Sequence, residues 1–174
     1  MVSNEILASI PWIKTVAKTG SSTLPWIKHP NDVDYLFICG KVPSGREHNN
    51  FFRQKPDTEC WLSRMMSSKF DHIWAYELPF MQVCYGTELP KWDIFEQQTE
   101  YKKILIDYGL DNPHSNIKMW YHVLTGIYML DNGDYFLTEE QAENVNLCHD
   151  RQMTKEIYDY IQKRLKEYRR ELDI

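Results

Sequence analysis

Two kinds of hydrophobic pattern divide the chain. In the first half, apolar and polar residues alternate, or apolar residues run together, over short stretches bounded by glycine, proline and polar turns. Alternation at every second residue is typical of a half-buried strand, and a short apolar run is typical of a fully buried one. The strands predicted in this way span 12–18, 35–39, 59–66 and 70–78.

Helical spacing dominates the rest of the chain. Apolar residues recur three and four positions apart, which places them along one face of a helix. A short helix is also expected within 4–10, where Pro11 ends it. Thr138 and Gln141 have the spacing of a capping box, which predicts a helix that begins there. The longer helices predicted span 93–108, 115–130 and 154–172.

Candidate chemistry gathers in the polar segment ahead of the second predicted strand. Gly20 and Ser21 form a turn whose backbone N–H groups and hydroxyl are suited to phosphate. Asp32 and Asp34 flank Val33, so on a strand both carboxylates point to one face while Val33 points to the core. Adjacent carboxylates repel each other unless a cation lies between them, and Mg²⁺ prefers such hard oxygen ligands. The alternative is a polar turn with two solvated aspartates.

The order of these motifs resembles the signature of the polymerase-β-like nucleotidyltransferase superfamily, which is Gly-Ser, a short gap, and Asp-x-Asp at the start of an apolar strand. The resemblance implies an enzyme that moves a nucleoside monophosphate from an NTP, with ATP the first candidate, to an acceptor hydroxyl and releases pyrophosphate. It also implies two Mg²⁺ ions, which Mn²⁺ can replace, bound by Asp32, Asp34 and a third carboxylate on a neighbouring strand. Asp71 is the first choice for that carboxylate, Glu77 the second and Glu59 the third.

A second group of residues is assigned to the nucleotide by the same resemblance. They are Gly20, Ser21, Ser22, Lys118 and His122. Lys118 and His122 lie four apart in a predicted helix, so they share one face and by resemblance face the phosphates. The family often has an arginine a few residues later, where this chain has Thr125 and Gly126. His122 is alternatively a histidine packed in the core.

The patterns and the resemblance together predict an α+β fold, with a nucleotidyltransferase-like mixed β-sheet flanked by helices and a C-terminal helical bundle. The catalytic domain is expected over 1–113 and the helical subdomain over 114–174. The acceptor is an RNA end, a small molecule or a protein, and the sequence does not choose among them. Two other functions stay open: a catalytically inactive relative that binds a nucleotide or a protein, and a phosphoester hydrolase that uses the same aspartates.

The amino-acid composition restricts the classes of binding partner and the cellular compartment that we expect for this protein. The formal net charge of −5 gives no broad attraction to nucleic acid, so any such contact must be local. Cys39, Cys60, Cys84 and Cys148 lack the spacing of a zinc site and are expected to be reduced residues of the core. No apolar run reaches the roughly 20 residues that span a membrane, and the first residues lack the pattern of a signal peptide. We therefore expect a cytoplasmic protein with no membrane partner.

Overall fold

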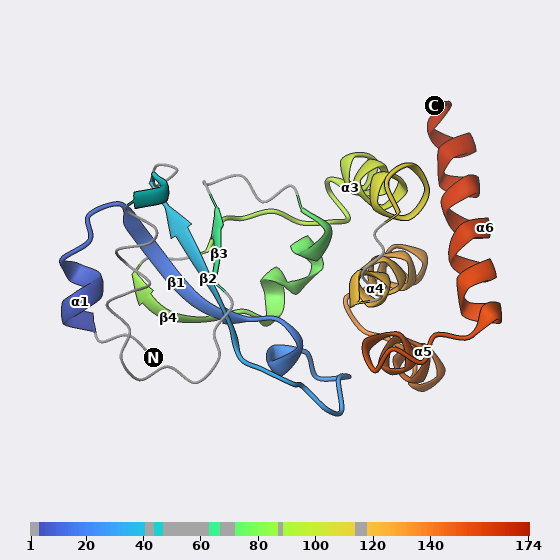
Figure 1. The fold of residues 1–174 in the computed structure, drawn as a ribbon. Coiled ribbons are helices and arrows are strands. Elements are labelled where there is room, and N and C mark those ends of the chain that lie inside the picture. The colour runs from blue at the N-terminus through green and yellow to red at the C-terminus, as the bar shows by residue number, and fades with distance from the viewer. Residues whose placement is uncertain (1–3, 41–43, 47–62, 67–71, 87–88, 114–117) are drawn as a thin grey trace. The chain divides into compact units, whose positions relative to one another are not determined.

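The computed structural model describes residues 4–40, 44–46, 63–66, 72–86, 89–113 and 118–174. Its fold is mixed α+β, as the sequence predicts. Four strands form one sheet in the order β3-β2-β1-β4: β1 (Ile13–Thr19), β2 (Asp34–Cys39), β3 (Ser63–Met66) and β4 (Gln82–Gly86). β1 is antiparallel to both β2 and β4, whereas β3 is parallel to β2, so the sheet is mixed (Figure 1).

Contacts within the chain define two compact units. The sheet unit comprises Met1–Leu24, His29–Phe70 and Glu77–Lys91, and the helical unit comprises Pro25–Lys28, Asp71–Tyr76 and Trp92–Ile174. The helical unit thus includes two short segments from the first half of the chain. The expected division into a catalytic domain and a C-terminal subdomain at residue 113 stays a prediction.

The sheet unit has a small apolar core between β1, β2 and the N-terminal helix α1 (Asn4–Ala8). Its fully buried members are Leu7, Ile13, Val16, Phe37 and Cys39. β1 and β2 confirm the strands predicted at 12–18 and 35–39. β3 confirms the part of the strand predicted at 59–66 that the structure describes.

The strand predicted at 70–78 is wrong. Ile73–Phe80 instead forms a 3₁₀-helical segment, η2, with a kink at Trp74 and with Pro79 inside it. Every residue from Ile73 to Leu78 is buried, so the alternation of residue types in the sequence does not separate a buried face from an exposed one. The sequence patterns also do not predict β4, because its residues are exposed or half-buried and give no apolar run.

Helices form in each of the long segments that the sequence predicts, although the helix predicted from residue 93 begins only at Gln98. Helix α3 (Gln98–Ile106) continues into a π-helical turn, η3 (Asp107–Asp111), and is followed by α4 (Lys118–Asn132), α5 (Glu139–His149) and α6 (Lys155–Leu172). The apolar stripe of α6 is buried, as its spacing predicts. Among the described residues, no helix combines the length and the apolar character needed to cross a membrane.

The predicted capping box at the start of α5 is confirmed. The Thr138 hydroxyl accepts a hydrogen bond from the Gln141 N–H at 3.2 Å, and the Gln141 side chain accepts one from the Thr138 N–H at 3.0 Å. The side chain of Thr154 caps α6 by accepting a hydrogen bond from the Ile157 N–H. Both helices therefore begin where short-range sequence signals place them.

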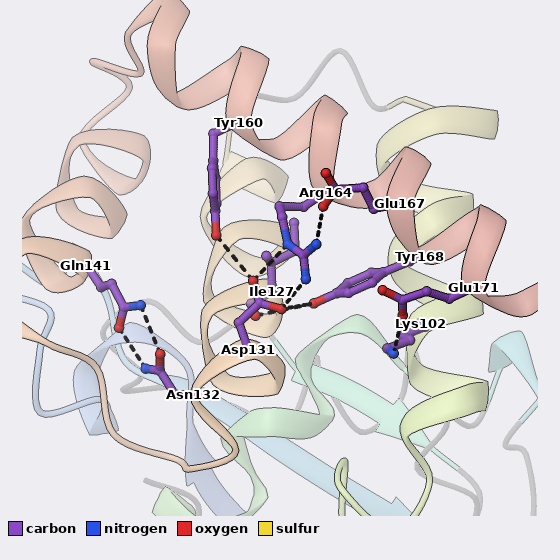
Figure 2. Close-up of polar contacts among 10 residues, drawn as sticks. All are labelled: Lys102, Ile127, Asp131, Asn132, Gln141, Tyr160, Arg164, Glu167, Tyr168 and Glu171. Carbon is purple, nitrogen blue, oxygen red and sulfur yellow. Dashed lines mark hydrogen bonds and ion pairs between the residues drawn. The ribbon is translucent and has the colours of Figure 1, made fainter.

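One carboxylate joins α6 to α4 (Figure 2). Asp131, near the end of α4, accepts hydrogen bonds from Arg164 Nε at 2.9 Å and Nη2 at 2.6 Å. The hydroxyls of Tyr160 and Tyr168 donate to the same carboxylate at 3.3 and 2.8 Å. Arg164 also pairs with Glu167 on its own helix. Asp131 is thus a shared acceptor for three side chains of α6.

A buried amide on α5 holds the segment 25–28. The Asn146 side chain accepts a hydrogen bond from the Lys28 N–H at 3.0 Å and donates to the carbonyl oxygens of Trp26 at 2.7 Å and Ala142 at 2.8 Å. This segment lies in the sequence between the Gly-Ser and Asp-x-Asp motifs. α5 therefore fixes the middle of the loop that connects the two motifs.

Candidate functional site

The end of β1 and the start of β2 bring the two motifs together. In the antiparallel register of these strands, Thr19 is the partner of Asp34. Gly20 follows Thr19 directly, so the Gly-Ser turn begins beside the second aspartate of the Asp-x-Asp motif. The register of the sheet sets this proximity. The structure therefore brings Gly20, Ser21 and Asp34 to one end of the sheet.

Gly20 lies against the Asp34 carboxylate in a conformation that requires glycine. Its φ is 76° and its ψ is −166°, a region of backbone space that is essentially limited to glycine. A Cβ atom on Gly20 would lie 2.2 Å from Asp34 Oδ2 and 2.9 Å from Asp34 Cγ. The carboxylate has little room to move, because Asp34 is only 6% exposed. Both the backbone angle and the missing side chain of Gly20 are therefore required.

A single 3₁₀ turn, η1 (Ser21–Thr23), follows Gly20. The N–H and the hydroxyl of Thr23 both donate to the Gly20 carbonyl oxygen, at 3.0 and 2.9 Å, and the Ser22 hydroxyl donates to the Thr19 carbonyl oxygen at 3.4 Å. Ser21 is buried and Ser22 is half-buried. The N–H groups of these two serines precede the first hydrogen bond of the turn, as leading N–H groups do at the start of a helix.

Glu77 supplies a second buried carboxylate at Gly20. Its side chain is 0% exposed, and its Oε2 accepts hydrogen bonds from the Gly20 N–H at 3.1 Å and from the Thr19 hydroxyl at 2.7 Å. The sequence offers three choices for the third carboxylate of the site. Glu77 is the one that the structure places beside Gly20, whereas Asp71 and Glu59 lie outside the described residues.

Asp32 lies in a bend before the strand, and β2 begins only at Asp34. Asp32 and Val33 are both half-buried, whereas Asp34 is buried. The predicted strand therefore does not include Asp32 and Val33, and the shared face of the two aspartates stays a prediction. The alternation of a strand does not extend back to Asp32, because the regular pairing with β1 ends at Asp34.

The oxygen ligands at this end of the sheet suit a hard cation. The carboxylates of Asp34 and Glu77 both contact Gly20, and Asp32 is two residues from Asp34. Among the residues that the structure describes, no group of three or more His, Cys, Asp or Glu side chains is arranged to hold a metal ion. Carboxylates are the ligand type that Mg²⁺ and Mn²⁺ prefer, and a metal site that uses Asp32, Asp34 and a third carboxylate stays a prediction.

His122 lies in the interior of the helical unit. It is 3% exposed, its Nδ1 is 2.7 Å from the Tyr76 hydroxyl, and its ring centroid is 4.0 Å from that of Tyr121. This environment is the core packing that the sequence leaves open as the alternative. Lys118 is the first residue of α4, and its side chain lies outside what the structure describes. The phosphate-binding role of both residues stays a prediction.

The buried cysteines do not have the properties of nucleophiles. Burial raises the pKa of Cys39 to about 11 and the pKa of Cys148 to about 12. Both thiols stay protonated near neutral pH, and the thiolate is the reactive form. These two residues and Cys84 have free thiols, as the sequence predicts. Cys84 is half-buried, so its predicted place in the core is wrong, and Cys60 lies outside the described residues.

Thr19 is the one residue of this site that the sequence does not indicate. It is 0% exposed, and its hydroxyl donates to Glu77. The available signal is weak, because it consists of a polar residue at the last position of a strand, directly before a Gly-Ser turn. Nothing in that signal identifies the acceptor, which is 58 residues away in the sequence.

No protein-family model, no curated protein and no solved structure matches this chain. Any function proposed for it therefore depends on its own residues and on their geometry.

Proposed function

We propose that the protein is a metal-dependent nucleotidyltransferase with a nucleotidyltransferase-like sheet, which transfers a nucleoside monophosphate from an NTP, with ATP the first candidate. The observation that carries the proposal is the contact of Gly20 with two buried carboxylates, Asp34 and Glu77, directly before Ser21. Carboxylate oxygens are the ligands that a divalent cation such as Mg²⁺ prefers, and the turn that follows Gly20 offers backbone N–H groups to a phosphate chain. A site for a divalent cation and a phosphate chain therefore uses both the acids and the turn.

The phosphate chain is assigned to Ser21 and Ser22. The Ser21 hydroxyl and the leading N–H groups of the turn are the donors suited to the β- and γ-phosphates, whereas the Ser22 hydroxyl already donates to the Thr19 carbonyl oxygen. Gly20 contributes through its missing side chain and does not donate to phosphate, because its N–H already donates to Glu77. The Glu77 carboxylate thereby holds the turn in its orientation.

The cation is assigned to Asp34 and to a second carboxylate, Glu77 or Asp71, and Asp32 is the further ligand that the sequence predicts. When bound, a divalent cation offsets the negative charge of the phosphates and of the leaving pyrophosphate. The acceptor hydroxyl loses its proton to a carboxylate oxygen, and its oxygen forms a bond to the α-phosphorus. The bond from the α-phosphorus to the β-phosphate oxygen then breaks, so pyrophosphate leaves.

Calorimetry with an ATP analogue tests the binding step. The analogue carries a methylene bridge between its α- and β-phosphates, so it binds without turnover. We expect binding that requires Mg²⁺ and that weakens at least about tenfold, or ~1.4 kcal/mol, in Asp34→Asn. Glu5→Gln is the matched control, because it removes one negative charge from an exposed position on α1 of the same unit. An affinity for the analogue that does not depend on Mg²⁺, or an equal affinity of Asp34→Asn and wild type, contradicts the proposal.

Transfer itself is tested by incubating the protein with Mg²⁺, a cell extract and each labelled NTP in turn. The molecule that becomes labelled identifies the acceptor as RNA, protein or a small molecule, and Asp34→Asn should not label it. Release of nucleoside monophosphate without incorporation supports the hydrolase instead. Metal-dependent binding with no turnover of any NTP supports the inactive relative.

A further inference from the structure

A cavity of about 500 Å³ lies among α4, α5 and α6 in the helical unit. Its walls include Tyr128 of α4, Glu140 and Asn144 of α5, and Glu156 and Tyr160 of α6. Cavities of roughly 300–1,000 Å³ are typical of small-molecule sites. None of these residues belongs to the proposed nucleotidyl-transfer site, so the inference is independent of the proposed function.

Two tyrosine rings form the aromatic part of the cavity. The ring centroids of Tyr128 and Tyr160 are 5.6 Å apart, and the rings are tilted by 34°. The Tyr128 hydroxyl accepts a hydrogen bond from Asn144 at 3.0 Å, and the Tyr160 hydroxyl donates to Asp131, so both rings are held in place (Figure 2 shows Tyr160). Burial raises the pKa of Tyr160 to about 12 and raises that of Tyr128, so both rings are neutral at physiological pH.

Two carboxylates lie at the wall of the same cavity. Glu140 and Glu156 are exposed and sit in the first turns of α5 and α6. Among the described residues, no ion pair uses either of them. The nearby cations are already paired, since Lys155 binds Asp159 and Arg164 binds Asp131. The wall of the cavity therefore combines two carboxylates with two tyrosine side chains.

We infer that this cavity binds a small organic polycation of the polyamine class. An ammonium group is attracted to a carboxylate and also to the face of a tyrosine ring, and the cavity offers both. The side-chain oxygens of Asn144 and Thr154 add hydrogen-bond acceptors for N–H groups. A flexible alkyl chain with an ammonium group at each end supplies one cation for each carboxylate and apolar methylene groups for the tyrosine side chains.

Spermidine is the probe, titrated by calorimetry into the wild-type protein at low salt. We expect saturable binding, and no binding of a neutral diol of the same length. The double variant Glu140→Gln/Glu156→Gln should bind spermidine about tenfold more weakly, which corresponds to ~1.4 kcal/mol. Glu139→Gln/Glu143→Gln is the matched control. It removes the same charge from exposed positions on α5 that do not line the cavity, and its affinity should stay within about twofold.

A second pair of variants tests the aromatic wall. Tyr160→Leu removes the ring and should weaken spermidine binding. Tyr160→Phe keeps the ring and should bind spermidine like wild type. Because both variants lose the hydroxyl contact with Asp131, a difference between them reports the ring alone. Shifts of the Asn144 side-chain amide in an NMR titration locate the bound polyamine. No saturable binding by wild type, equal weakening by the two glutamate double variants, or equal binding by Tyr160→Leu and Tyr160→Phe overturns the inference.

Discussion

Replacing Gly20 by alanine tests the central feature of the candidate site. The substitution acts in two ways, because Gly20 has a backbone conformation reserved for glycine and because its missing side chain leaves room for Asp34. Holding an alanine in this glycine-only backbone conformation costs about 2 kcal/mol of stability. Forcing a methyl group to within 2.2 Å of a buried carboxylate oxygen adds about 2 kcal/mol. The expected loss in the free energy of unfolding is therefore about 4 kcal/mol.

Two other glycines separate the two contributions. Gly133 has a φ of 66° but nothing within 4 Å of its Cβ position, so Gly133→Ala reports the cost of a positive φ alone, about 1 kcal/mol. Gly40 has no positive φ, and its Cβ would meet only the flexible end of Lys14. Gly40→Ala in the same sheet unit should therefore change stability by less than about 1 kcal/mol.

Urea denaturation followed by circular dichroism measures these differences. A double-mutant cycle with Asp34→Ala gives the steric part directly, because that change removes the two Asp34 atoms nearest to the new methyl group. Gly20→Ala should be about 2 kcal/mol less harmful in the Asp34→Ala background. Equal costs for Gly20→Ala and Gly40→Ala, or no coupling between Gly20 and Asp34, would show that the reasoning about this turn is wrong.

Three further predictions concern the helical unit and the thiols. Asn146→Ala removes three hydrogen bonds of a buried amide and should lower the free energy of unfolding by about 3 kcal/mol, measured by urea denaturation. Asp131→Asn removes the charged acceptor shared by α6 and should cost about 2 kcal/mol in the same assay. A thiol reagent at pH 8 should label Cys84 in the native protein, and Cys39 and Cys148 only after unfolding. Burial raises the pKa of these two thiols above the usual 9.0, so their ionisation favours the unfolded state and stability should fall as the pH rises above about 9.

The helices follow from the sequence because their signals are local. The capping box of Thr138 and Gln141 spans three residues, and each apolar step along α6 spans three or four. The apolar run of β2 is equally local. The region around η2 is not predictable in this way, since a segment buried on every side shows no contrast between its faces. An alternation of residue types then carries no information about which secondary structure forms.

The candidate site was predictable only in part, for a related reason. Gly20, Ser21 and the aspartates are close in sequence, and their order indicates phosphate and metal chemistry. The contact between Glu77 and Gly20 joins residues 57 apart, so no spacing rule reveals it. Glu77 is also part of a 3₁₀ helix and not of the strand predicted at 70–78, so the side-chain alternation of a strand does not indicate where its carboxylate lies.

The path of the loop between the Gly-Ser and Asp-x-Asp motifs is fixed by a contact that the motifs themselves do not reveal. The register of Thr19 with Asp34 fixes the distance from the Gly-Ser turn to the strand aspartate, whatever the length of the loop. Loop closure by itself depends only weakly on length, so the loop is free to vary unless something holds it. Asn146 holds it, through the backbone groups of Trp26 and Lys28. The register of β1 and β2 therefore sets the proximity of the Gly-Ser turn to Asp34, whereas the hydrogen bonds of Asn146 on α5 set the path of the loop.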